Sequence, residues 1–258
     1  MENYRGASLF QLIDLQPRTS RQIILSYVLD VYTVETDIRL QAIRQDMGSP
    51  IQTVYTLPSS LIPSDDNNIK TQSAAIVGRE RNPYQKAKLI YEWMIKEGLV
   101  QSESSGGGAL EALEEKQADS YSAALLFCAL ARAADIPCLP VSGVLINRFL
   151  STTRHYWVEF WIDSYGWIPV DPALGAGVAP ADFNLRENPA AWYFGNADNQ
   201  RISFSRGQIV LTQMDPRGRI LGRVREYAMQ NLLEEAVGRL ESYSSLWSDI
   251  TITGMYTQ

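Results

Sequence analysis

The stretch SYSAALLFCALARAA at residues 120–134 constrains the fold of this 258-residue chain more than any other segment. Between Ala123 and Ala134 its only charged residue is Arg132. A helix with one apolar stripe lies on a surface, whereas a helix that is apolar nearly all round has to be buried. We therefore predict a central helix that begins near Ser120 and is enclosed by the rest of the domain.

The residues after Pro137 are typical of strands. Three runs, at 139–146, 155–162 and 166–171, are rich in β-branched and aromatic residues. The short connection DSYG at 163–166 predicts a hairpin between the second and third runs.

The register of this hairpin decides which side chains share a face, because side chains alternate along a strand. Pairing Ile162 with Gly166 places His155 and Asp171 on one face. Pairing residue 161 with residue 168 would separate them unless a bulge intervenes. We expect the first register, or a bulged equivalent with the same result.

The region before the central helix is predicted to be helical as well. Asn82 followed by Pro83 indicates a helix start, and Gly98 indicates a helix stop. Between them, apolar residues recur at the spacing of one helix face, namely at Ala87, Ile90, Tyr91 and Met94. The run ALEALEEKQ at 109–117 predicts a further short helix. Helices followed by antiparallel strands predict an α+β fold.

The two ends of the chain are predicted to extend this core, which we place at 68–175. Residues 22–57 are crowded with β-branched and aromatic residues, so we expect a β-rich N-terminal region over 1–67. The remaining 176–258 are expected to complete the fold with further strands and a helix. The expected elements are a hairpin of 207–213 with 219–224, a helix at 228–240 and a closing strand at 248–255.

Composition argues against several classes of function. The net charge is −6 and no basic tract is present, which argues against a nucleic-acid partner. No apolar run reaches the roughly 18 residues of a membrane-spanning helix, and the first residues lack the pattern of a secretory signal. With two cysteines and one histidine, no zinc spacing is recognisable. We expect Cys128 and Cys138 to be buried, reduced thiols, and we expect neither a metal nor a cofactor.

Three residues could carry chemistry together. The single histidine, His155, opens the aromatic run HYWVEFWI, Asp171 ends the next predicted strand, and Ser120 begins the central helix. A nucleophile at a helix N-terminus, a base on a strand and an acid on the neighbouring strand form the arrangement of a thiol-type triad. The helix N-terminus favours negative charge on the nucleophile and on a nearby oxyanion. Each residue also has an ordinary role, as a helix cap, a structural strand residue and a turn acid, respectively.

Residues 69–175 resemble a bacterial transglutaminase-like domain of the papain-like cysteine protease superfamily. The family pattern His-x-Trp-Val-Glu matches HYWVE at 155–159, and Gly-Trp-x-x-Val-Asp-Pro matches GWIPVDP at 166–172. The tryptophan-containing helix end of the family matches IYEWM. Looser likenesses are YFGN and RISF after the core, and the expected β-rich start, which resembles the N-terminal sandwich of some members. The resemblance implies a papain-like fold, a site made of Ser120, His155 and Asp171, and a peptide or protein segment as partner. It also implies the bacterial envelope or periplasm as the compartment.

The departure from the family falls on the decisive residue. The family's Gly-x-Cys at the start of the central helix reads Ala118, Asp119 and Ser120 in this chain. A cysteine thiol, with a pKa of about 8.5, can be shifted to a resting thiolate beside imidazolium, whereas a serine hydroxyl cannot. Serine in a site shaped for sulfur is therefore expected to react very slowly. Cys128 lies about two turns inside the helix and cannot replace it.

Three origins of Ser120 stay open: natural loss of activity, a natural switch to serine chemistry, and an engineered replacement. Ala118 and Asp135 also depart from the family pattern, which favours natural divergence. We expect a weakly active or inactive domain that holds a peptide or protein segment in the former substrate groove. One alternative is an active amide acyl-transfer enzyme, in which Ser120 (or a native cysteine in its place) attacks, His155 shuttles the proton and Asp171 orients His155. The other is a purely structural envelope domain.

Overall fold

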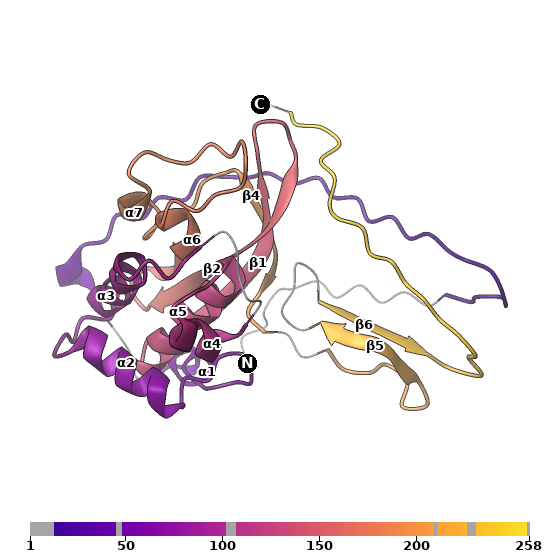
Figure 1. Cartoon of the computed structure of the whole chain (residues 1–258), viewed down its shortest axis with the longest axis horizontal. Helices are drawn as coiled ribbons and strands as arrows, with labels where there is room; N and C mark the ends of the chain where they lie inside the picture. Colours follow the sequence, from indigo (N-terminus) through magenta and orange to yellow (C-terminus); the bar gives the residue numbers. More distant parts are fainter. Residues whose placement is uncertain (1–12, 45–47, 102–106, 209–210, 226–230, 257–258) are drawn as a thin grey trace.

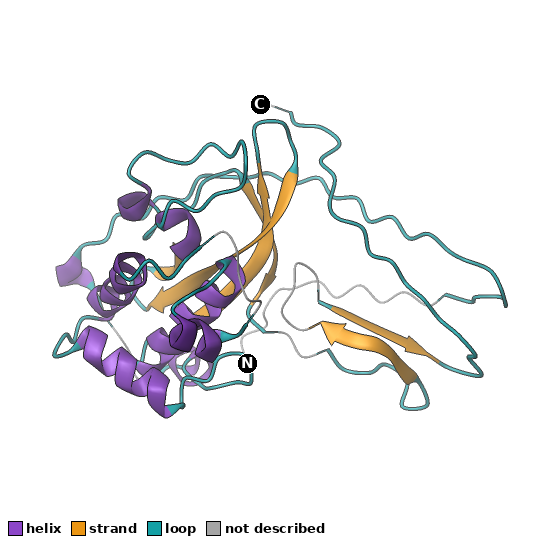
Figure 2. Ribbon diagram, viewed as in Figure 1, coloured by secondary structure: helices purple, strands orange, loops and turns teal. Residues whose placement is uncertain are grey.

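The computed structural model describes residues 13–44, 48–101, 107–208, 211–225 and 231–256. Helices gather on one side of a four-stranded antiparallel sheet with the strand order β3-β2-β1-β4 (Figure 1 and Figure 2). A separate two-stranded sheet pairs β5 with β6. The predicted α+β class of the core is confirmed.

The elements have the following bounds. The helices are the 3-10 helix η1 (Leu40–Ala42), α1 (Pro50–Tyr55), α2 (Asn67–Val77), α3 (Pro83–Lys96), α4 (Ala109–Glu115), α5 (Ser120–Ala133), α6 (Pro172–Gly175) and α7 (Pro189–Trp192). The strands are β1 (Cys138–Ile146), β2 (Thr152–Ile162), β3 (Gly166–Val170), β4 (Arg201–Arg206), β5 (Arg219–Arg225) and β6 (Leu232–Ala236).

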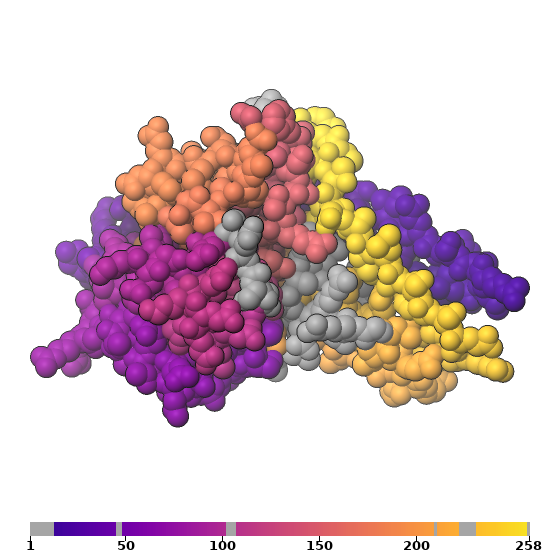
Figure 3. Space-filling view, viewed as in Figure 1, coloured from indigo at the N-terminus to yellow at the C-terminus, as the bar shows by residue number. Residues whose placement is uncertain are grey.

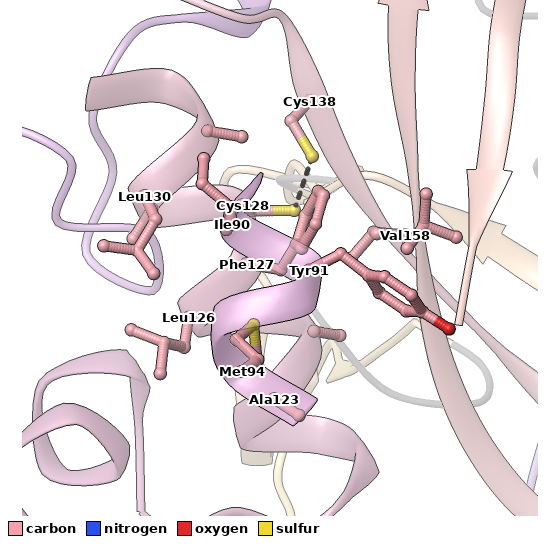
Figure 4. Close-up of a cluster of buried hydrophobic side chains, with 14 of the residues drawn as sticks. Ile90, Tyr91, Met94, Ala123, Leu126, Phe127, Cys128, Leu130, Cys138 and Val158 are labelled. Carbon is pink, nitrogen blue, oxygen red and sulfur yellow. Dashed lines mark hydrogen bonds between the residues drawn. The ribbon is translucent and has the colours of Figure 1, made fainter. Parts of the chain in front are cut away.

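Helix α5 is the buried centre of the fold, as its composition predicts. Every residue from 122 to 131 is buried, and the helix packs against β1 and β2 with α2, α3 and α4 around it. Figure 4 shows Leu126, Phe127 and Leu130 of α5 among side chains of the neighbouring elements. Burial of each such side chain stabilises the fold by about 1.5–3 kcal/mol. Within the described residues, no helix combines the length and apolar character needed to cross a membrane.

The helix starts follow from short-range polar contacts. The Asn82 side chain caps α3 by accepting hydrogen bonds from the next backbone N–H groups, and Pro83 occupies the first helical position, as predicted. At α5 the cap is Asp119, whose carboxylate accepts the N–H of Ser122 at 2.8 Å. The Ser122 hydroxyl in turn accepts the N–H of Asp119 at 3.1 Å. Ser120 is therefore the first residue of the helix, and the suggestion that it serves as the cap is wrong.

The hairpin of β2 and β3 has the expected register. Ile162 pairs with Gly166, and Val158 pairs with Val170. Gly166 has φ +87°, a left-handed conformation that suits glycine at the end of a tight connection. Continuing this register one step further brings Asp171 opposite Trp157.

The predicted β-rich N-terminal region is wrong. Residues 13–39 contain no strand, and their one bridge pairs Val34 with Ala197. The run IQTVYTL at 51–57, part of the region expected to be β-rich, lies largely in α1, because Ser49 caps the helix and Pro50 occupies its first turn. A β-branched run becomes a strand only where a neighbouring strand supplies hydrogen bonds, and the described residues offer none here. Figure 3 shows the N-terminal segment (indigo) reaching away from the helical half of the molecule.

The C-terminal predictions are also only partly correct. β5 pairs with β6, not with 207–213; residues 209–210 of that run lie outside the described residues. The expected helix at 228–240 is wrong for LLEEA, which forms β6, and its residues 228–230 are outside the described part. The closing strand at 248–255 is absent from the described structure, where this segment is irregular. Instead, β4 completes the main sheet by pairing with β1.

Candidate active site

His155 and Asp171 come together as the hairpin register predicts. His155 lies on β2, and Asp171 follows β3 directly and caps α6. The imidazole Nε2 lies 2.8 Å from Asp171 Oδ2. Both side chains are buried, with relative exposures of 4% and 1%. Because Asp171 continues the register opposite Trp157, it is the diagonal neighbour of His155 across the two strands.

Asp171 is held as a carboxylate by three partners. Its Oδ1 accepts the backbone N–H of Leu174 at 3.0 Å, and its Oδ2 accepts from His155 and from Arg201 Nη1 at 3.0 Å. Burial acts to raise the pKa of Asp171, but His155, Arg201 and the Leu174 N–H outweigh it and lower the pKa below its ordinary value. A carboxylate can only accept hydrogen bonds, so Nε2 of His155 is the donor. The other ring nitrogen, Nδ1, is then the acceptor in the neutral imidazole.

Arg201 is the residue of this site that sequence reasoning missed. It begins β4, is 8% exposed and donates through Nη2 to Asp198 at 3.0 Å. Its guanidinium also lies over the rings of Trp157, at 5.0 Å, and Tyr193, at 5.8 Å. In the sequence, Arg201 belonged only to a family-like segment, RISF. The available signal was Asp198, an acid three residues before an arginine that opens an alternating strand.

Ser120 is not hydrogen-bonded to this pair. The residue is half-buried at the start of α5, and within the described residues its hydroxyl has no hydrogen-bond partner. The rings of Tyr121 and Tyr156 meet edge to face at 5.1 Å, so the start of α5 lies beside the first half of β2. Side chains alternate along β2, so His155 and Tyr156 point to opposite faces of the strand. The structure therefore joins His155 to Asp171, and it records no hydrogen bond from Ser120 to either.

The motif residue Glu159 has a structural partner. Its carboxylate accepts from Arg206 Nε at 2.9 Å, across the intervening strand β1. Burial raises the pKa of Glu159, and the charge and hydrogen bonds of Arg206 act against that rise. This pair ties β2 to β4 and lies four residues along the strand from His155.

The cleft found between the helices lies apart from the site, and no candidate metal site is found in the described part of the chain. A cleft of about 520 Å³ between α2, α3 and α4 is lined by residues that include Trp93, Leu113 and Lys116, but by neither Ser120, His155 nor Asp171. Among the described residues, no group of three or more His, Cys, Asp or Glu side chains could hold a metal ion.

The sequence of the core matches a known family. Residues 70–172 match the family model of the transglutaminase-like superfamily. This part of the chain is thus similar to transglutaminase-like domains, as the sequence motifs indicate, and its core is α+β.

Two proteins are similar over a larger part of the chain. A Haemophilus influenzae protein described only as uncharacterized is 26% identical over 221 residues, which cover 72% of this chain and 56% of that protein. A crystal structure from Cytophaga hutchinsonii, of a protein proposed to be a cysteine protease, has 20% identity and a TM-score of 0.43. That match covers 61% of this chain and 54% of the other. The chain therefore spans little more than half the length of these relatives.

Proposed function

We propose that the transglutaminase-like domain binds a peptide or protein segment and has weak or no catalytic activity. The observation that carries this proposal is the position of Ser120. It occupies the first turn of the buried helix, where the family places its nucleophilic cysteine, and its hydroxyl has no hydrogen bond to His155 or to any other described residue. A serine nucleophile depends on direct transfer of its proton to a base during attack.

The chemistry of the hydroxyl supports weak activity. A thiol beside imidazole can rest as a thiolate, so the nucleophile of a cysteine site is already deprotonated before the substrate binds. A serine site has no such resting state and needs both the base contact and an oxyanion hole placed for the shorter C–O bond. The backbone N–H groups at the start of α5 remain suited to an oxyanion or a peptide carbonyl.

The surroundings of Ser120 support a binding role. Tyr121 and Tyr156 are half-buried and packed against each other next to it. Tyrosines that present an apolar ring and a polar hydroxyl are enriched at sites that bind peptides and proteins. Transglutaminase-like domains act on protein substrates, so a peptide or protein segment is the ligand class that this site fits.

An active acyl-transfer enzyme is the second candidate, and the retained His155–Asp171 pair favours it. In that reaction Ser120 Oγ would attack an amide carbonyl and pass its proton to His155 Nδ1. The C–N bond would then break, the departing amine would take the proton from His155, and the resulting ester would be resolved by water or by a second amine. Asp171 would orient the imidazole throughout.

Labelling of Ser120→Cys with iodoacetamide tests whether the site still activates a nucleophile. Cys128 and Cys138 serve as internal references, because both are wholly buried and burial raises the pKa of Cys138. We expect position 120 to react faster than either, and His155→Ala in the same background to slow it. Equal rates with and without His155 would leave Ser120 with no catalytic role.

The unmodified protein separates the two candidates. A fluorophosphonate probe, which reacts with activated serines, is expected to leave Ser120 unlabelled. Labelling that Ser120→Ala abolishes would establish the enzyme instead.

Binding is tested with a displayed library of random peptides. The wild-type domain is expected to enrich a set of related peptides, and Tyr121→Ala is expected to lose them. Tyr32→Ala, at a tyrosine that is 74% exposed in the N-terminal segment, is the matched control and should retain them. Failure to enrich any peptide, or equal loss in both variants, contradicts the proposed site.

A further inference from the structure

Arg201 binds two buried carboxylates beside His155. One guanidinium nitrogen, Nη1, binds Asp171 Oδ2, and the other, Nη2, binds Asp198 Oδ2, both at 3.0 Å. Asp198 is 1% exposed, so the arginine bridges two buried carboxylates. Buried charges are stable only when they are paired and hydrogen-bonded, which makes the three groups depend on one another.

The oxygen that Arg201 contacts is the one that receives His155. Oδ2 of Asp171 lies 2.8 Å from Nε2 and 3.0 Å from Nη1, whereas Oδ1 is taken by the start of α6. Without Arg201, the buried carboxylate would have an imidazole as its only side-chain partner. A proton on the imidazole would then be the nearest source of the missing positive charge.

The guanidinium is fixed in place by more than its ion pairs. Its central carbon lies 5.0 Å from the ring centroid of Trp157 and 5.8 Å from that of Tyr193. The Trp157 ring is also stacked beside His155, with ring centroids 6.2 Å apart. Arginine presents its donors in a rigid planar fork, which a lysine ammonium does not reproduce. Arg201 is therefore a buried residue that contacts the hydrogen-bond partner of the imidazole, and it is not an isolated ion pair at the surface.

We propose that Arg201 is a positioning residue for His155. It supplies the fixed positive charge that holds Asp171 as the acceptor of Nε2–H, and this leaves Nδ1 as the nitrogen that can take up or release a proton. The inference goes beyond the proposed function, because it requires neither a reactive Ser120 nor a bound peptide.

The charged and titratable groups around the cluster come from several elements. Asp171 contacts the imidazole and Arg201, and Arg201 in turn contacts Asp198. The charge of Asp171 adds to the rise in the pKa of Tyr91, and that of Asp198 adds to the rise in the pKa of Tyr193. Burial raises the pKa of both phenols, so they stay neutral across the physiological range. At the start of α5, Asp119 and Tyr121 act on Tyr156, on the other face of β2.

The single histidine makes a direct test possible, because a ¹⁵N-histidine spectrum contains one imidazole. The measured quantity is the pH midpoint at which Nδ1 of His155 gives up its proton. Arg201→Met removes the buried cation and is expected to raise this midpoint by about one pH unit or more. Asp198→Asn removes an anion and is expected to lower it. Arg201→Lys restores the charge and should return the midpoint toward that of the wild type.

Leu145→Ala is the structural control. Leu145 is buried and pairs with Arg201 across the β1–β4 ladder. Its truncation therefore removes packing next to Arg201 without changing any charge. Its midpoint should equal that of the wild type. A wild-type midpoint in Arg201→Met, or a shift in Asp198→Asn of the same sign as in Arg201→Met, overturns the proposal. If Arg201→Met does not fold, the Asp198→Asn and Arg201→Lys arms decide it. Because the readout is the imidazole itself, failure here leaves the peptide-binding proposal standing.

Discussion

Asp171 lies one residue beyond the paired end of β3, and from there its carboxylate receives His155 Nε2 at 2.8 Å from the neighbouring strand. The same carboxylate caps α6 through the Leu174 N–H and pairs with Arg201. One side chain thus joins a strand end, a helix start and the edge of the site. Substitutions there are expected to act on stability and on the site together.

Replacing Asp171 with Asn should destabilise the fold by about 3–5 kcal/mol, because it leaves Arg201 buried beside Asp198 alone and removes the anion that His155 faces. Urea denaturation of the two proteins measures the difference. Asp182→Asn is the control, since Asp182 pairs with Arg148 at the surface, with side-chain exposures of 39% and 65%. That change should cost less than about 1 kcal/mol. Equal costs for the two variants would show that the buried cluster contributes no special stability.

The contribution of Asp171 to stability should depend on pH in one direction. Its pKa is lowered in the folded state, whereas an unfolded aspartate titrates near about 3.9. The stabilisation is therefore complete above the unfolded value and is lost as the pH falls through the folded value. As the pH falls below about 4, the difference in unfolding free energy between wild type and Asp171→Asn should therefore shrink. A difference that grows over that acidic range would contradict this sign.

Leu126→Ala should destabilise the protein by about 2–5 kcal/mol, because it opens a cavity in the middle of the wholly buried helix α5. The free energy of unfolding in urea is the measurement. Leu246→Ala, at a leucine that is 94% exposed, should change it by less than about 0.5 kcal/mol. A small effect at position 126 would mean that α5 is not the packed centre of the domain.

Gly175→Ala tests the packing of α6 against α3. A Cβ at this position would overlap the Tyr91 hydroxyl, so the substitution should cost about 1–3 kcal/mol. Tyr91→Phe removes the overlapping oxygen, and the double variant should recover part of the loss. The comparison is a double-mutant cycle read by thermal or urea unfolding. Purely additive costs would indicate that the two residues do not meet.

Several features of this fold could be predicted from local sequence alone. The twelve residues from Ala123 to Ala134 carry one charge. On the protein surface such a helix would expose apolar side chains to water, so burial of α5 could be predicted. Asn82 with Pro83 is a self-contained start signal that needs no tertiary partner. The short DSYG connection limits the hairpin to few registers, which is why the approach of His155 to Asp171 could also be predicted.

Other features depended on contacts between distant parts of the chain. Residues 22–34 have the composition of a strand but pair with no sheet in the described structure, because β-propensity acts only where a partner strand is present. LLEEA became a strand by pairing with β5, although its residues are also good helix formers. In both cases the presence or absence of a partner strand, rather than the local sequence, decided the secondary structure.

The candidate site divides in the same way. Sequence by itself determined which residues have the chemistry, namely a serine at a helix start, one histidine and an acid after a strand. Only the tertiary structure decided that Arg201 from β4 joins the His155–Asp171 pair. The physical reason is that a buried charge needs compensation within a few ångströms, and the group that supplies it can come from any strand that the sheet topology brings alongside.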